Sequence, residues 1–415
     1  MVVGSMIGAG IFVLPSSLAP FGWTSIVSWI FTGLGVMAIA LVIAQLTKER
    51  PQEPSILTIS GDILGLLPSR MIAWSYWFAL VGSSATLAVV AATYLLYLMP
   101  WATDASWSQP LLAFFILAAI TLLNMQGLRG AGQFQVITTL LKLLPLAFVI
   151  GIIFFLFFSA PETYSASKSV PFSWAMLTPA IGVTFFAMLG FECAGLITQR
   201  VHDPERNVVR ATLYGLALVL VIYFVVSTGI ILASPASELS LENAPLAAFA
   251  SAHTGPWSGA AIALFAAISA IGCLNATVLL LGDIPFGMAR DGQLPEWIAP
   301  TSETGIGHRP LLAGSGVAIA LVLASSNALG EQVLDFLLRL TTASAIWFYA
   351  GICVAAIIAK VMRGLAIVGI GFSGWVLFGT GAEASLLGIG LMLVGLVAHF
   401  LVGGRTKPRG SSPAT

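Results

Sequence analysis

The sequence predicts an all-α integral membrane protein with about twelve transmembrane helices. Hydrophobic residues make up 58% of the 415 residues and charged residues only 8%, and the mean hydropathy is +0.99. Soluble domains carry about 25% charged residues. The apolar residues form long runs rather than short alternating segments, which indicates membrane-spanning helices and not a barrel.

Twelve apolar runs are long enough to cross a bilayer, and we expect one helix in each. They lie at 1–19, 23–46, 71–99, 109–126, 134–158, 172–198, 208–233, 257–289, 311–327, 333–359, 362–379 and 384–403. Residues 1–404 are therefore expected to form one transmembrane domain. Residues 405–415, which are mostly Gly, Ser, Pro and basic residues, are expected to form a cytoplasmic tail.

Lysine and arginine fall almost entirely on one side of the expected bilayer. If residue 1 lies near the cytoplasm, fourteen fall in inner loops or the tail and only Lys168 in an outer loop, while Lys142 and Arg339 lie within spans. The positive-inside rule then places both termini in the cytoplasm. We expect the protein to lie in the cytoplasmic (inner) membrane. The first residues already belong to an apolar run, so we expect no cleavable signal peptide.

The first span contains the segment GSMIGAGIFVLP, with Gly4, Gly8, Gly10 and Pro15. Each glycine costs ~1 kcal/mol relative to alanine inside a helix, which disfavours a continuous helix here. Unpaired backbone groups within a bilayer are tolerated only where they are buried in protein or line a cavity. The segment predicts a broken helix beside a polar pocket. Close packing of a neighbouring helix on the glycines is the alternative.

The sixth span has a second interruption, with Pro179 upstream, Gly190 in mid-span and Glu192 two residues later. Spans 1 and 6 are five apart and therefore cross in opposite directions. This predicts two inverted repeats at 1–158 (helices 1–5) and 172–359 (helices 6–10), followed by helices 11 and 12 at 362–403. Paired breaks in the two halves indicate a transporter's binding site near the midplane.

Four segments resemble motifs of the amino acid–polyamine–organocation (APC) transporter superfamily. GSMIGAGIFVLP at 4–15 is similar to the first-helix pattern G-x-x-I-G-[SA]-G-I-F-x-x-P. TTLLKLLPL (138–146), GFECAGLITQRVHDPERNVVRA (190–211) and GMARDGQLPEW (287–297) agree in the same order. The resemblance covers essentially the whole chain. It implies two inverted five-helix repeats, two further helices, and alternating-access transport of amino acids or related amines.

The resemblance also implies which backbone groups hold an amino acid. Amides freed at the break in helix 1 would meet the carboxylate, and carbonyls freed at breaks 1 and 6 would meet the ammonium. By motif match the amides belong to Ile7, Gly8, Ala9 and Gly10, beside Ser5 and Met6, and the carbonyls belong to Met6, Phe186, Ala187 and Met188. Many relatives have serine where this chain has Ala9, which puts selectivity in question.

Phe186 falls where arginine and polyamine exchangers of this superfamily carry an aromatic lid. An aromatic face over a cation offers ~0.5–2 kcal/mol. The alternative is a ring that faces lipid or neighbouring helices.

Two acidic residues are candidates for coupling or gating. An ionised carboxylate at mid-bilayer costs at least ~2.5 kcal/mol, so Glu192 must be protonated, paired or facing water. In the resembling antiporters the acid at this position is implicated in coupling or gating. The alternative is a protonated carboxyl bonded between helices. Asp283, near the cytoplasmic end of span 8, pairs with a basic residue, serves an inner gate or is merely interfacial.

Lys142 lies about nine residues into span 5, well inside the hydrocarbon. In sodium-coupled transporters of this architecture a sodium ion bridges helices 1 and 8. In some sodium-independent relatives a lysine of helix 5 reaches that place, and Lys142 matches it. Desolvation favours the neutral amine, which suits a proton carrier. Lys142 either replaces sodium and carries a proton or is a fixed structural cation, and both readings predict sodium independence.

The remaining polar residues suggest structural roles. Asp335 and Arg339 are spaced i, i+4 and read as a helix ion pair. The three cysteines all lie in apolar runs and imply no disulfide framework. The four histidines have no ligand spacing, so we expect no metal and no cofactor. The zero net charge gives no basic surface for nucleic acid.

The sequence therefore predicts a secondary active transporter, not an enzyme, that moves amino acids by sodium-independent proton symport or substrate antiport. Basic amino acids or polyamines are the first candidates. A neutral or branched-chain amino acid is the alternative, because Glu192 is the one clear acidic receptor. A membrane enzyme is disfavoured by the scattered histidines and the lack of a G-x-S-x-G motif. A channel would need a continuous polar pore, which the spans do not contain. The expected partners are the bilayer, a small substrate and, as a candidate, a proton.

Overall fold

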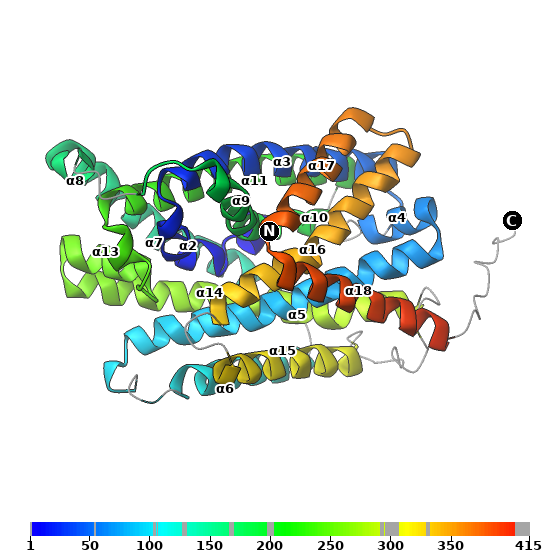
Figure 1. Cartoon of the computed structure of the whole chain (residues 1–415). Helices are drawn as coiled ribbons and strands as arrows, with labels where there is room; N and C mark the ends of the chain where they lie inside the picture. Colours follow the sequence, from blue (N-terminus) through cyan, green and yellow to red (C-terminus); the bar gives the residue numbers. More distant parts are fainter. Residues whose placement is uncertain are drawn as a thin grey trace, which may run out of the picture.

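The computed structural model describes residues 2–53, 55–102, 105, 107–126, 131–165, 170–196, 203–290, 294, 307–328 and 333–402. The regular structure of these residues is helical and forms one bundle (Figure 1). The helices are α1 Val2–Met6, α2 Gly10–Leu18, η1 Ala19–Phe21, α3 Trp23–Glu49, α4 Ile56–Leu64, α5 Leu66–Tyr97, η2 Pro100–Ala102, α6 Ser108–Met125, α7 Ala131–Ser159, α8 Glu162–Ser165, α9 Trp174–Met188, α10 Cys193–Leu196, α11 Pro204–Ala233, α12 Ala236–Leu239, α13 Pro245–Thr254, α14 Pro256–Arg290, α15 His308–Ala328, α16 Val333–Ile358, α17 Arg363–Gly379 and α18 Ala382–Val402.

This architecture confirms the prediction of an all-α integral membrane protein. Seven described helices are long and apolar enough to cross a membrane individually, namely α3, α5, α6, α7, α11, α14 and α16. The chain bends by 118° between α17 and α18, and the two helices together are long and apolar enough for one crossing. Segments α2–η1, α9 and α15 are apolar but shorter. Each predicted span holds a helix or a broken pair, while the count of twelve crossings stays a prediction.

Both predicted breaks are present. In the first span α1 ends at Met6 and α2 begins at Gly10, and in the sixth span α9 ends at Met188 and α10 begins at Cys193. The structure therefore places short non-helical segments inside two apolar spans, as the glycines of the sequence indicate.

Long helices surround the broken ones. Helix α5 packs against both α14 and α16, and α3 packs against both α11 and α9. Helices α2 and α9 contact each other, and α2 also contacts α11 (Figure 1). Paired hydroxyl groups join helices in the apolar interior: Thr32 to Thr184 at 2.7 Å, and Thr121 to Ser315 at 2.8 Å. Such bonds satisfy groups that lipid cannot.

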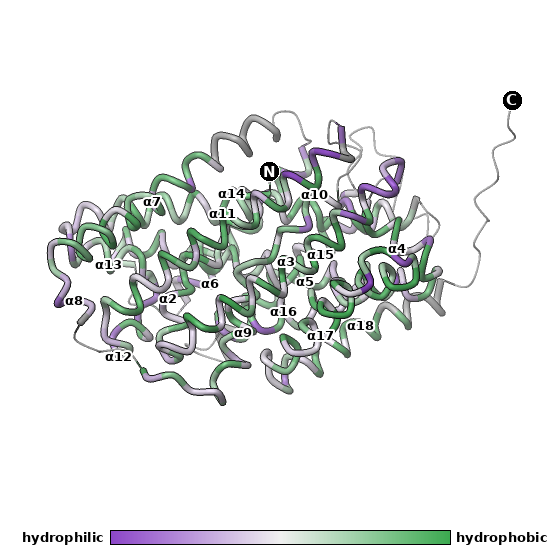
Figure 2. The backbone as a smooth tube through the Cα atoms, turned by 90° about the horizontal axis from the view of Figure 1, so that it is seen from above, coloured by the Kyte–Doolittle hydropathy of each residue, from purple (hydrophilic) through white to green (hydrophobic). Residues whose placement is uncertain are grey.

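The two ends of the bundle differ in polarity. Figure 2 shows hydrophilic residues gathered at the end where α4 and α10 lie, whereas α8, α12 and α13 lie at the other end. The predicted ion pair is confirmed, with Arg339 Nη2 3.0 Å from Asp335 Oδ2. Lys168 and the tail 405–415 lie outside the described residues.

Candidate functional site

The break in the first span leaves backbone donors without partners. The amide of Ile7 donates to Val3 O at 3.0 Å and that of Gly8 donates to Met6 O at 2.9 Å. Among the described residues, the amides of Ala9 and Gly10 have no backbone acceptor. Both residues are buried. Buried unpaired amides are rare in folded proteins, so these two are candidates for a ligand's acceptor oxygen.

The break in the sixth span is a turn from Leu189 to Glu192. Gly190 has φ +102°, a left-handed conformation that residues with a Cβ rarely adopt. A Cβ at Gly190 would also lie 3.0 Å from Ser5 O, so the two breaks touch each other there. Ser5 Oγ lies 3.0 Å from Gly190 O and 2.8 Å from Val2 O.

Three consecutive carbonyl oxygens of the first span accept hydrogen bonds from three other helices. Lys142 Nζ on α7 donates to Gly4 O at 2.9 Å, Cys273 Sγ on α14 donates to Ser5 O at 3.4 Å, and Tyr223 Oη on α11 donates to Met6 O at 2.7 Å. The Lys142 side chain is fully buried, so its amino group depends on this contact for the hydrogen bond that water cannot supply there. The helix α1, before the first break, is thus held from three sides.

The carboxylate of Glu192 is surrounded by donors. Tyr76 Oη on α5 lies 2.7 Å from Oε1, while Tyr349 Oη on α16 and the Gly190 amide lie 2.8 and 3.0 Å from Oε2. All three partners can donate, which is the arrangement that stabilises an ionised carboxylate in a buried place. Glu192 therefore links the broken sixth span to α5 and α16.

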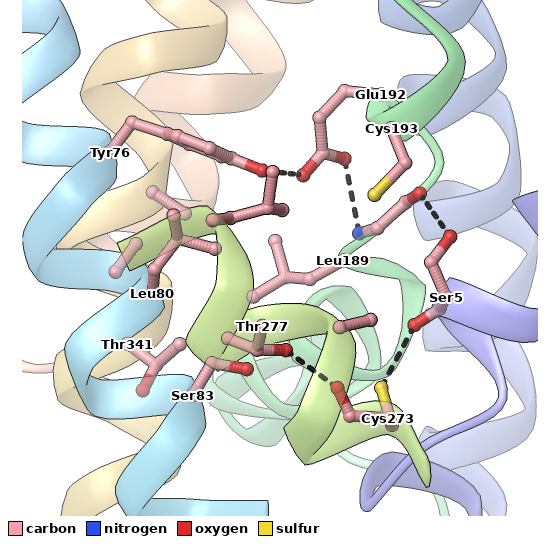
Figure 3. Close-up of a pocket in the computed structure, with 15 residues that line it drawn as sticks. Ser5, Tyr76, Leu80, Ser83, Leu189, Glu192, Cys193, Cys273, Thr277 and Thr341 are labelled. Atoms are coloured by element: carbon pink, nitrogen blue, oxygen red, sulfur yellow. Dashed lines mark hydrogen bonds between the residues drawn. The ribbon is translucent and has the colours of Figure 1, made fainter. Parts of the chain in front are cut away.

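A cavity of about 70 Å³ lies beside these contacts (Figure 3). Its wall is mostly apolar, and Glu192 is the one charged side chain among the described residues that line it. The lining consists of Ser5, Leu189, Gly190, Glu192 and Cys193 from the two breaks, Tyr76, Ala79, Leu80 and Ser83 from α5, Cys273, Ala276, Thr277 and Leu280 from α14, and Thr341 and Ala345 from α16. A mainly apolar wall with a few convergent polar groups is typical of a ligand site, although the volume is below the ~300–1,000 Å³ usual for one.

The structure brings only part of the predicted site to this cavity. Ser5 and Glu192 line it, whereas the other residues proposed to bind substrate do not. Met6, Ile7, Gly8, Ala9 and Gly10 are buried at the first break.

The last turn of α9 is also buried, and it packs closely on the first span. A Cβ at Gly10 would lie 2.9 Å from the Cα of Ala187. Phe186 is 6% exposed and therefore does not face lipid, and it is absent from the cavity lining. Its role as a lid stays a prediction.

The two other charged candidates are separate from the cavity lining. Lys142 contacts the first break from behind, through Gly4 O. Asp283 is half-buried on α14, has an interaction partner and does not line the cavity. Its assignment to an inner gate stays a prediction.

Sequence reasoning missed the donors that organise the site: Tyr76, Tyr223, Cys273 and Tyr349. Each of these residues has a polar atom in an apolar span. The buried hydroxyl group of a tyrosine in such a place needs a hydrogen-bond partner. That signal marks a tyrosine for attention but does not identify its partner, which lies far along the chain.

Comparison with known proteins adds the family. The family model described as "Amino acid permease" matches residues 1–409. The chain belongs to the amino acid permease family. It is therefore a membrane transporter and not an enzyme, as the APC resemblance implies.

Curated relatives of this permease are antiporters by name. A "Putative arginine/ornithine antiporter" of Bacillus subtilis (strain 168) is 27% identical, with 96% of this chain and 94% of the relative covered. A "Cadaverine/lysine antiporter" of Escherichia coli (strain K12) is 26% identical over 82% of this chain and 77% of its own length. A "Putative arginine/ornithine antiporter" of Escherichia coli (strain K12) is 26% identical over 96% of this chain and 89% of its own length. These similarities support amino acid transport or antiport by this permease.

Proposed function

We propose that this permease is a sodium-independent antiporter of basic amino acids and related amines in the cytoplasmic membrane, working by alternating access. The observation that carries the proposal is Glu192, the one charged side chain among the described residues lining the cavity. An anionic group in a mainly apolar site favours a cationic ligand. The names of the relatives point to the same substrate class. Proton symport is the alternative form of coupling.

The two ends of an amino acid match groups at the first break. The unpaired amides of Ala9 and Gly10 would donate to its carboxylate, because they lie at the amino end of α2, where the helix dipole favours negative charge. The Ser5 carbonyl and the Glu192 carboxylate would accept its ammonium. Amines without a carboxylate would bind only to the Ser5 carbonyl and the Glu192 carboxylate.

Lys142 would stand in for a sodium ion. Its Nζ atom supplies a positive charge at Gly4 O, on a carbonyl of the broken helix, and it is fully buried. A positive charge already fixed at the break leaves no need for a metal cation there. This supports transport without sodium.

Tyr76, Glu192 and Tyr349 would form the inner gate. Tyr76 precedes Ser83 on α5 by seven residues, or about 10 Å of helix rise. Tyr349 follows Thr341 on α16. Tyr76 and Tyr349 both bond to Glu192, and Tyr76 lies nearer than Ser83 to the start of α5, which follows α4. Protonation of Glu192 would turn one of its oxygens into a donor, so one tyrosine would have to accept instead of donate, and the loss of the charge-assisted bonds would loosen the gate.

The packing supports the inverted repeats and the orientation. Helices α3 and α11, α5 and α14, and α6 and α15 pack in pairs, and each pair joins spans five apart. The hydrophilic end at α4 and α10 would face the cytoplasm, in agreement with the positive-inside rule. Both termini would then be cytoplasmic.

Counterflow in proteoliposomes tests the function. Vesicles preloaded with unlabelled lysine, ornithine, arginine or cadaverine should accelerate uptake of labelled lysine, and replacing sodium by choline should change nothing. Acceleration by leucine or valine but by no cationic substrate would favour the neutral-substrate alternative. A strict need for sodium would contradict the role given to Lys142.

A further inference from the structure

The middle carbonyl of the three at the first break is held by the weakest donor. Gly4 O accepts from an ammonium at 2.9 Å and Met6 O from a phenol at 2.7 Å, whereas Ser5 O accepts from the Cys273 thiol at 3.4 Å. A thiol is a weak donor, and an ammonium is a strong one. Ser5 O is therefore the carbonyl from which a bound cation can most easily displace the present partner.

The same carbonyl belongs to a residue on the cavity wall. Ser5 and Cys273 both line the cavity, together with Glu192, while Gly4 and Met6 are absent from the lining (Figure 3). A cation that enters the cavity thus meets the thiol contact and not the other two.

The displaced thiol has a defined way to move. A Cβ at Gly8 would lie 2.7 Å from Cys273 Sγ, so the sulfur already rests against the first span and cannot move further towards it. Rotation about Cα–Cβ turns it instead towards the preceding turn of α14. There the thiol can donate to the carbonyl oxygen four residues earlier in its own helix. Hydroxyl groups in α5 make the same kind of bond, from Ser84 to Leu80 O and from Thr86 to Gly82 O.

We propose that the ammonium group of the substrate replaces the Cys273 thiol at Ser5 O, which makes Cys273 a determinant of substrate affinity. In the empty site the thiol keeps the carbonyl paired. In the occupied site the carbonyl accepts from the substrate and the thiol turns away. This inference rests on the proposed function, because it needs a cationic amine in the cavity.

Affinity of the purified full-length protein for L-lysine tests the inference. Cys273→Ala removes the competing donor, so the Kd for L-lysine should fall about two- to fivefold, the equivalent of one weak hydrogen bond. Cys273→Ser introduces a stronger donor and should raise the Kd above that of the wild type. If the Cys273 thiol only fills space, Cys273→Ala should bind L-lysine more weakly than the wild type, and Cys273→Ser should change the Kd little. Equal or weaker binding by the alanine variant, or serine as tight as alanine, would overturn the inference.

Two controls complete the test. Cys353→Ala removes a buried thiol of α16 that is absent from the cavity lining and should leave the Kd unchanged. Nα,Nε-diacetyl-lysine, which lacks both ammonium groups, should gain nothing from Cys273→Ala.

An infrared measurement does not depend on the variants at 273. In a Cys193→Ala/Cys353→Ala background whose Kd for L-lysine matches that of the wild type, the S–H stretching band of Cys273 should shift when L-lysine binds, and an unchanged band would contradict displacement. If the wild type binds none of L-lysine, L-ornithine, L-arginine and cadaverine, the proposed function fails. If it binds them and the Cys273 results are contrary, only this inference fails.

Discussion

Lys142 Nζ lies 2.9 Å from the carbonyl oxygen of Gly4, although the two residues are 138 positions apart in the chain. The contact joins α7 to α1, the first half of the broken first span. It gives the fully buried amino group of Lys142 a hydrogen-bond partner. Burial without a counterion disfavours the charged form, so the hydrogen bond to Gly4 O is the contact that offsets part of this cost.

Substitution of Lys142 by Met should abolish transport without unfolding the protein. The lost hydrogen bond and the relief of a buried charge act in opposite directions on stability, so the net change should stay within ~2 kcal/mol. Uptake of labelled lysine into proteoliposomes should fall at least ~tenfold, because the first break loses its positive charge. Lys48→Met, at the exposed end of α3, is the matched control. Unchanged pH-dependent uptake by Lys142→Met would remove the coupling role.

Substitution of Glu192 by Gln should weaken transport of cationic substrates and flatten its pH dependence. The amide keeps the size of the carboxyl but replaces one of its two acceptor oxygens by an NH2 donor, which faces Tyr76 or Tyr349, and it carries no charge. We expect at least a ~tenfold loss of lysine counterflow and similar rates at pH 6 and pH 8, where the wild type should differ. Glu238→Gln, on an exposed turn of α12, should behave as the wild type. A wild-type pH profile in Glu192→Gln would contradict gating by this carboxyl.

Substitution of Gly190 by Ala should destabilise the contact between the two breaks. A side chain at φ +102° is strained, and its Cβ would lie 3.0 Å from Ser5 O. Strain of this kind costs ~1–3 kcal/mol and should lower the melting temperature in detergent. Gly364→Ala, in α17 with open space at the Cβ position, should leave the melting temperature unchanged or raise it. A lower melting temperature for Gly364→Ala than for Gly190→Ala would contradict the geometry of the break.

Substitution of Tyr223 by Phe should remove the phenol from Met6 O while keeping the ring. The loss of one buried hydrogen bond is expected to cost ~0.5–1.5 kcal/mol and to slow transport, because the first break is then held by two donors instead of three. Tyr214→Phe lies on the same helix with 74% of its side chain exposed, and it should leave both properties unchanged. Thermal unfolding and counterflow measured on both variants give the comparison.

The breaks could be predicted from the sequence, whereas their partners could not. The spacing of Gly8 and Gly10 and the position of Gly190 are local signals, and the structure has non-helical segments at both places. Lys142 stands out as a charge in an apolar run for the same reason. Tyr223 and Cys273 are ordinary residues of apolar helices until the fold brings them to Met6 and Ser5, more than 200 positions away. The amides of Ile7 and Gly8 were also predicted to be free, but local turns pair them within the first span.

The hydroxyl group of Ser5 has a single hydrogen and two acceptors within reach, Val2 O in its own helix and Gly190 O in the other broken span. If the two spans move apart in the proposed alternating access, that hydrogen can pass from the distant acceptor to the local one. Separation therefore strands no donor, and the energetic barrier to opening is lower than for a contact with one acceptor. Closing again restores the bridge at equally little cost, which suits a protein that must repeat the movement with every molecule it carries.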